Sequence, residues 1–132
     1  HKIPTKNILI DSDGGGQYLS HEMKWVQPFI NNSKALNNEN YKNLKTQCFY
    51  KLAEQINAAN VWIKWNDKEL RNKISEELEV IRRKNIDMDG KLAILSKKEM
   101  IATLGHSPDY ADALMMRMRY MFKNNNRIVA WR

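Results

Sequence analysis

The sequence predicts a single α/β domain with a central sheet. Short apolar segments rich in β-branched residues alternate along the chain with longer segments whose apolar residues recur every three or four positions. The 132 residues can bury one hydrophobic core, and a hydrophobic content of 42% favours folding over disorder. The single cysteine, Cys48, excludes an internal disulfide and a cysteine-based zinc site.

The first third of the chain predicts a strand, a helix and a second strand. The apolar residues 7–10 form a strand that ends at a polar, glycine-rich turn over residues 11–16. Residues 17–24 are predicted to form a short helix. Residues 25–30 are predicted to form a second strand, which its proline places near a sheet edge or at a strand end. The asparagine-rich residues 31–40 are expected to form a loop.

The middle of the chain predicts two amphipathic helices with a strand between them. The first helix starts near Tyr41, and the alternating residues 61–65 that follow it predict a strand. Asn66 or Asp67 then caps the second helix. The apolar stripes of the two helices are Leu44, Cys48, Leu52 and Ile56 in the first, and Leu70, Ile74, Leu78 and Ile81 in the second.

The last third of the chain predicts a strand over residues 91–95 and a final helix. Ser107 is expected to be the N-cap of this helix, with Pro108 at its first position and Asp109 in its first turn. Cys48 and the methionines of the final helix are interpreted as core residues.

The net charge of +7 favours a polyanionic partner such as nucleic acid or an anionic membrane surface, although a mildly basic, solvated surface explains it equally well. No apolar run approaches the roughly 18 residues that a membrane-spanning helix needs. No segment has the strong apolar face of a membrane-surface helix. The net charge is therefore compatible with a polyanionic partner but does not identify one.

Carboxylates gather at two structurally useful points. Asp11 and Asp13 follow the first strand, where the sites of open α/β sheets are found. Asp109 and Asp112 lie three residues apart in the first turn of the final helix and share a face. Together they can bind a hard divalent cation, but turn formation and the helix dipole account for them as well.

The same glycine-rich turn allows two other interpretations. Asp11, Asp13, Gly16 and Glu22 match positions of a calcium-binding loop, but Gly15 stands where a ligand is required and a strand precedes the loop. The three consecutive glycines can also cradle a phosphate at a helix N-terminus. They match neither the dinucleotide-binding fingerprint nor the P-loop pattern.

Five segments, in this order and spacing, resemble the C-terminal nuclease domain of the large terminase subunits of tailed phages. The segments are residues 8–16, 26–29, 41–45, 92–100 and 104–114, and the resemblance extends over residues 7–122. The most specific segment is the last one, whose sequence is LGHSPDYADAL.

The resemblance implies a ribonuclease H-like fold, in which helices flank a mixed central sheet. It also implies a two-metal site that holds Mg²⁺ or Mn²⁺ and cuts concatemeric double-stranded DNA during genome packaging. Asp11 and Asp109 correspond to catalytic metal ligands, and Asp112 is expected to be a further metal ligand. Two such ions activate a water molecule and stabilise the leaving oxygen.

The resemblance further implies partners and a location. Double-stranded DNA is the expected substrate, and the portal protein and the small terminase subunit are the expected protein partners, in the cytoplasm of a bacterium that carries a phage or prophage. The residues expected to contact the DNA backbone are Lys97, Lys98, Arg117 and Arg119. Residues 123–132 are expected to form a basic C-terminal tail.

The sequence departs from the family pattern at two points, and the second affects whether a complete nuclease domain is expected. The usual Gly-Val-Gly is replaced by three glycines, and the first catalytic Asp of the family, which lies on an earlier strand, has no counterpart after His1. Residues 1–122 are therefore expected to be the later portion of an incomplete nuclease domain, without its N-terminal strands, and whether this chain is itself an enzyme stays open. The alternatives are a non-catalytic DNA- or portal-binding remnant and a ribonuclease H-like enzyme with another role, such as a resolvase.

Overall fold

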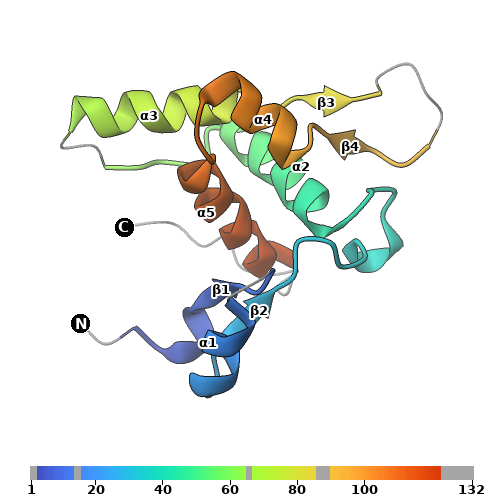
Figure 1. Cartoon of the computed structure of the whole chain (residues 1–132), viewed down its shortest axis with the longest axis vertical. Helices are drawn as coiled ribbons and strands as arrows, with labels where there is room; N and C mark the ends of the chain where they lie inside the picture. The colour runs from blue at the N-terminus through green and yellow to red at the C-terminus, as the bar shows by residue number, and fades with distance from the viewer. Residues whose placement is uncertain (1–2, 14–15, 65–66, 86–89, 123–132) are drawn as a thin grey trace.

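The computed structural model describes residues 3–13, 16–64, 67–85 and 90–122 (Figure 1). These residues form both helices and short strands, so the predicted α/β class is confirmed. The predicted basic tail, residues 123–132, lies outside the described residues. No helix in the described ranges is long and apolar enough to cross a membrane.

The N-terminal part forms a small strand–helix–strand unit, as predicted. Its elements are a 3₁₀ turn at Thr5–Asn7, strand β1 at Leu9–Asp11, helix α1 at Gly16–Glu22 and strand β2 at Gln27–Phe29. β1 and β2 pair in parallel, with Asp11 opposite Phe29. Asp11 is therefore the last residue of β1, at the carboxyl end of the sheet. The loop that follows β2 contains only a 3₁₀ turn at Leu36–Asn38.

Helix α2 (Leu44–Asn57) supplies one wall of the core. It begins where the side chain of Asn43 accepts a hydrogen bond from the backbone N–H of Thr46, which satisfies one of the free donors of the first turn. Its buried residues include three members of the predicted apolar stripe, Leu44, Cys48 and Leu52, whereas Ile56 is exposed. Burial raises the pKa of the Cys48 thiol to about 12, so this cysteine is a core residue and not a reactive thiolate.

The strand predicted over residues 61–65 is wrong for the part of it that the structure describes. Residues 61–64 belong to no strand or helix, and no strand of the described ranges pairs with them to take their hydrogen bonds. Helix α3 (Lys68–Glu79) follows, and its N-cap is Asp67, one of the two residues predicted for that role. The Asp67 side chain accepts from the backbone N–H of Glu69.

Two elements were not predicted, strand β3 (Arg83–Lys84) and helix α4 (Lys97–Leu104). β3 consists of two basic residues and pairs antiparallel with β4 (Ala93–Ile94), which lies within the strand predicted at residues 91–95. In the described ranges the strands thus form two separate two-stranded sheets. α4 begins with a capping box between Ser96 and Glu99, a pattern that is visible in the sequence.

Helix α5 (Asp109–Arg117) runs through the middle of the molecule and continues into a 3₁₀ turn at Met118–Phe122 (Figure 1). It packs against both α2 and α3. The interpretation of the methionines as core residues is confirmed for Met115 and Met118, which are buried. The core cluster comprises Phe29, Leu44, Cys48, Phe49, Leu52, Ala111, Met115 and Met118.

The predicted N-cap of α5 is wrong. Pro108 occupies the cap position, no side chain caps the helix from there, and the Ser107 hydroxyl is buried without a hydrogen-bond partner in the described part of the chain. A residue from another helix supplies the missing acceptor. The side chain of Glu77 in α3 is only 2% exposed, and its Oε2 accepts a hydrogen bond of 2.9 Å from the backbone N–H of Ala111.

Replacing Glu77 with Ala should therefore destabilise the fold. The substitution leaves the buried N–H of Ala111 without an acceptor, a loss of about 1–3 kcal/mol. Thermal unfolding should show a melting temperature several degrees lower for Glu77→Ala. Glu76→Ala, at an exposed position of the same helix, is the matched control and should melt close to the parent protein. Equal melting temperatures for both variants would contradict a capping role for Glu77.

Candidate functional site

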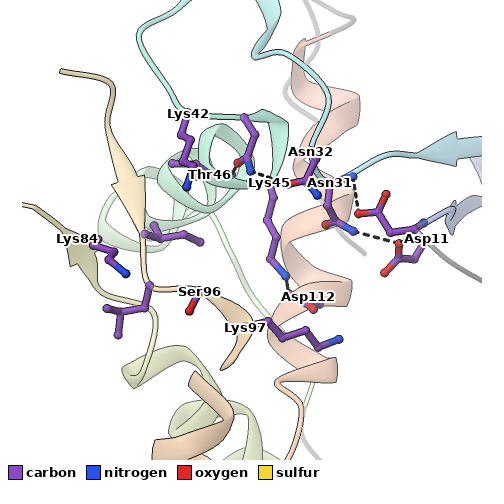
Figure 2. Close-up of a pocket in the computed structure, with 14 residues that line it drawn as sticks. Asp11, Asn31, Asn32, Lys42, Lys45, Thr46, Lys84, Ser96, Lys97 and Asp112 are labelled. Carbon is purple, nitrogen blue, oxygen red and sulfur yellow. Dashed lines mark hydrogen bonds and ion pairs between the residues drawn. The ribbon is translucent and has the colours of Figure 1, made fainter. Parts of the chain in front are cut away.

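A polar cavity of about 370 Å³ lies between the carboxyl end of β1, the start of α2, the segment from β4 into α4, and the first turn of α5 (Figure 2). An isolated parallel bridge between Tyr41 and Leu92 holds the β4 segment beside the start of α2. The side chains of this cavity come from segments that are far apart in the sequence. The lining residues include three aspartates, Asp11, Asp13 and Asp112, and four lysines, Lys42, Lys45, Lys84 and Lys97.

The acidic end of the cavity is organised by Asn31, which follows β2. Its side-chain amide donates to Oδ1 of Asp11 over 3.0 Å, and its backbone N–H donates to Oδ2 of Asp13 over 3.2 Å. Oδ1 of Asp11 also accepts from the backbone N–H of Asp13 over 3.0 Å. One asparagine thus fixes both carboxylates at the end of the parallel strands, because β1 and β2 end side by side.

Gly16 is required by the close approach of α1 to β1. A Cβ atom at this position would overlap the backbone carbonyl oxygen of Asp11, which cannot move without displacing the end of the strand. The last of the three consecutive glycines therefore has a steric role beside the site. The predicted calcium-loop and phosphate-cradle interpretations depend on Gly14 and Gly15, which lie outside the described residues.

Asp112 faces the cavity from α5 and forms an ion pair with Lys45 of α2 (Figure 2). The Lys45 ammonium nitrogen lies 2.8 Å from Oδ1 of Asp112, and the two side chains are only 16% and 15% exposed. The geometry is that of an ion pair without a well-directed hydrogen bond. The same ammonium group lies 5.7 Å from the centre of the Phe49 ring, a distance at which the ring attracts a cation.

The structure separates the two aspartates of α5. Asp112 lines the cavity, whereas Asp109 is exposed at the first residue of the helix and does not line it. The sequence spacing that predicts a shared helix face does not determine which of the two residues reaches the cavity. Among the predicted metal ligands, the structure thus brings Asp11 and Asp112 to one cavity and leaves Asp109 outside it.

The four cations predicted to contact DNA do not share one cavity. Lys97 lines the acidic cavity, and Lys98 is exposed beside it on α4. Arg117 lines a different cavity with Leu9 and Tyr120, and burial lowers the pKa of its guanidinium group. Arg119, in the 3₁₀ turn after α5, is partly buried.

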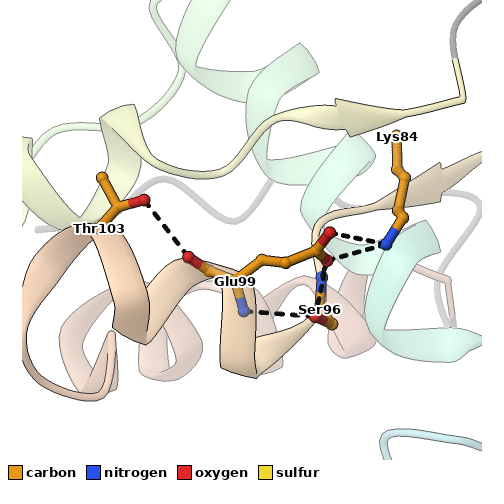
Figure 3. Close-up of polar contacts among 4 residues, drawn as sticks. All are labelled: Lys84, Ser96, Glu99 and Thr103. Atoms are coloured by element: carbon orange, nitrogen blue, oxygen red, sulfur yellow. Dashed lines mark hydrogen bonds and ion pairs between the residues drawn. The ribbon is translucent and has the colours of Figure 1, made fainter.

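Lys84, one of the four lysines that line the cavity, is held in place by Glu99 of α4 (Figure 3). The Lys84 ammonium donates to Oε1 and Oε2 of Glu99 over 2.7 and 2.9 Å, and the backbone N–H of Ser96 donates to Oε2 over 2.7 Å. The hydrogen bond from Lys84, followed by those from Ser96, lowers the pKa of Glu99 to about 2. This contact joins β3 to the start of α4.

The donor chemistry of the cavity suits Mg²⁺ or Mn²⁺, because both ions prefer carboxylate and amide oxygens. Asp11, Asp13, Asn31 and Asp112 supply such oxygens from three elements or the loops after them. The ammonium group of Lys45 already occupies the position of a cation beside Asp112. Within the described ranges, however, no three acidic, histidine or cysteine side chains converge closely enough to form a complete metal site.

Asn31 and Lys45 were not identified from the sequence. Asn31 follows the second strand of a parallel pair, so the rule that sites form at the carboxyl ends of such strands could have found it. No comparable signal marks Lys45, which reaches Asp112 only because α2 and α5 pack together.

A parallel strand–helix–strand unit with a polar cavity at its carboxyl end is typical of open α/β folds, which place their sites at this edge of the sheet. Comparison with solved structures finds this fold in the nuclease domain of the large terminase subunit gp2 of bacterial virus Sf6. That nuclease domain superposes with a TM-score of 0.65 and 25% sequence identity, covering 83% of this chain. Two structures of its K428A mutant, one with manganese and one with manganese and beta-thujaplicinol, match with a TM-score of 0.65 and 24% identity.

These comparisons confirm the predicted resemblance and the ribonuclease H-like fold class. This chain spans 63–64% of the length of those structures. No protein-family model and no curated protein sequence matches the chain. The described fold is therefore similar to part of a terminase nuclease domain. The residues of the cavity indicate which activity this fold could support.

The Glu99 contact predicts a specific pH dependence of stability. Because the pKa of Glu99 is lowered to about 2 in the folded protein from 4.5 in the unfolded chain, its stabilising effect is fully present above pH 4.5 and is lost as the pH falls toward 2. Glu99→Gln keeps a capping side chain but removes the ion pair with Lys84. The parent protein should melt at a higher temperature than Glu99→Gln at pH 6, and this difference should shrink between pH 4.5 and 2.

Glu76→Gln, an exposed charge change on α3, serves as the control for net charge and should show no such pH-dependent difference. A melting difference between the parent protein and Glu99→Gln that stays constant from pH 6 to pH 2 would show that the ion pair does not form.

Proposed function

We propose that this chain forms part of a metal-dependent endonuclease that cuts double-stranded DNA, as in the large subunit of a phage terminase. The observation that carries the proposal is the meeting of Asp11 and Asp112 in one cavity from opposite ends of the chain. Capping or turn formation explains each aspartate alone, but neither explains why the fold brings them to a common polar cavity with Asp13.

In this proposal Asp11, Asp13 and Asp112 hold Mg²⁺ or Mn²⁺. Ions held there would supply a water molecule of lowered pKa and positive charge to stabilise the leaving oxygen. Asn31 orients Asp11 and Asp13 through its two hydrogen bonds. Gly16 allows α1 to pack against the end of β1 without displacing the Asp11 backbone.

The basic residues at the cavity attract the DNA backbone. Lys42 and Lys97 are exposed at the cavity, and neither forms an ion pair within the described residues. Contacts from lysine to phosphate do not depend on base sequence and weaken as salt rises. Lys98, Arg117 and Arg119 are also proposed to contact DNA. Arg117 would do so from a second cavity, because it does not line the one that contains Asp11 and Asp112.

The wider role follows the same resemblance. Residues 1–122 would belong to the nuclease domain and residues 123–132 to a basic tail, with a further metal-binding aspartate supplied from outside this chain. The substrate would be concatemeric DNA during genome packaging in the bacterial cytoplasm. The portal protein and the small terminase subunit would be the protein partners.

One observation favours the second candidate, a non-catalytic DNA- or portal-binding module. The Lys45 ammonium neutralises Asp112 within the protein, so the cavity is stable without a metal ion. A chain that has lost cleavage can therefore keep this fold and its basic surface. The two candidates differ in whether the aspartates matter for DNA cleavage or only for stability.

The proposal is tested by plasmid cleavage with Mn²⁺, using the full-length gene product that contains these residues. Asp11→Asn and Asp112→Asn should each reduce cleavage about 100-fold or more, the scale of removing an electrostatic group that acts on a transition state. Asp109→Asn is the matched control on the same helix, and cleavage should stay within a few-fold of the parent protein because Asp109 does not line the cavity.

If Asp11→Asn and Asp112→Asn both cleave the plasmid as fast as the parent protein, the assignment of the metal-binding residues is overturned. If cleavage falls with Asp109→Asn but not with Asp112→Asn, the two residues of α5 have exchanged roles. Salt-dependent DNA binding without cleavage in the parent protein would favour the binding module. Far-UV circular dichroism of each variant separates loss of activity from loss of folding.

A further inference from the structure

The ion pair between Lys45 and Asp112 has a consequence for metal binding. We propose that Lys45 is an internal counter-ion that occupies Asp112 in the metal-free protein, and that a divalent cation must displace its ammonium group to bind there. This inference rests on the proposed metal-binding function of the cavity. In it, Lys45 competes with the divalent cation for Asp112 and thereby lowers the affinity of the cavity for that cation.

The burial of the pair supports this role. The two side chains are about 85% shielded from water, so the attraction between them is screened much less than that of a surface ion pair. A carboxylate shielded to this degree requires a nearby cation. Lys45 meets this requirement when no metal ion is bound, and a divalent cation meets it when one is present.

The backbone holds Lys45 at this place. The N–H of Lys45 donates to the backbone carbonyl oxygen of Asn31 over 3.1 Å, and the side chain of the same Asn31 holds Asp11. The Phe49 ring lies against the ammonium group from the core side. The counter-ion and the acidic end of the cavity are thus positioned by one residue, Asn31.

The other lysines of the cavity do not share this role. Lys84 is paired with Glu99, whose carboxylate is also held by Ser96. Lys42 and Lys97 form no ion pair with a carboxylate within the described residues. Lys42 lines the same cavity, lies three residues before Lys45 in the chain and carries the same charge, so it is a matched control for a purely long-range effect of charge.

The experiment measures Mn²⁺ binding to the purified chain by electron paramagnetic resonance of free Mn²⁺. The Lys45→Met variant should bind Mn²⁺ about five- to tenfold more tightly than the parent protein, the scale of removing one competing ion pair. Lys42→Met should change the affinity less than twofold. Lys45→Arg keeps the charge and should bind like the parent protein.

The double variant Lys45→Met with Asp112→Asn isolates the pair. It should lose the gain in affinity, because the carboxylate that Lys45 blocks is absent. Melting temperatures with and without Mn²⁺ check that each protein is folded, and Mn²⁺ should raise the melting temperature of Lys45→Met more than that of the parent protein. Lys45→Gln replaces Lys45→Met if the methionine variant does not fold.

Three outcomes overturn the inference. If Lys45→Met and Lys42→Met raise the affinity equally, the effect is general electrostatics and Lys45 is no special competitor. If Lys45→Met binds Mn²⁺ no more tightly than the parent protein, the ion pair does not compete, while the proposed function stands. If no protein binds Mn²⁺ at millimolar concentration, the proposed metal site of this chain fails together with the inference.

Discussion

The burial of α5 between α2 and α3 is the constraint on which the cavity depends. Ala111 and Met115 are fully buried, and the Glu77 carboxylate binds the backbone N–H of Ala111, the residue immediately before Asp112. The position of Asp112 is therefore set by core packing and by a hydrogen bond that the backbone of α5 donates to Glu77 of α3. A backbone held in this way keeps Asp112 at a fixed place in the wall of the cavity.

A second connection runs through Asn31 and joins the two ends of the cavity. Its side chain and backbone N–H hold Asp11 and Asp13, and its carbonyl oxygen accepts from the backbone of Lys45. Because Lys45 in turn pairs with Asp112, the three carboxylates are linked through two residues. Within the described residues, the charge of Asp112 is thus balanced by a lysine of the protein itself.

The basic charge of the chain acquires a more specific meaning from this arrangement. Some cations neutralise carboxylates within the protein, as Lys45 and Lys84 do, while Lys42 and Lys97 stay available at the cavity. The net charge of +7 counts each such pair as neutral, so it does not say which of the remaining cations lie at the cavity. The acidic end of the cavity lies at the carboxyl ends of β1 and β2, the edge at which open α/β sheets usually place their sites.

The sequence by itself determined the α/β class, the strand before Asp11, the two amphipathic helices of the middle of the chain, and the resemblance to a terminase nuclease domain. These features depend on local patterns, such as apolar periodicity and capping residues, that a single segment contains. The tertiary structure alone decided that residues 61–64 form no strand, that Glu77 caps α5 in place of Ser107, and that Asp112 rather than Asp109 lines the cavity. Each of these depends on which segments pack side by side. A strand needs a partner strand, and a buried N–H needs an acceptor, here from a neighbouring helix. The cavity has walls from distant parts of the chain.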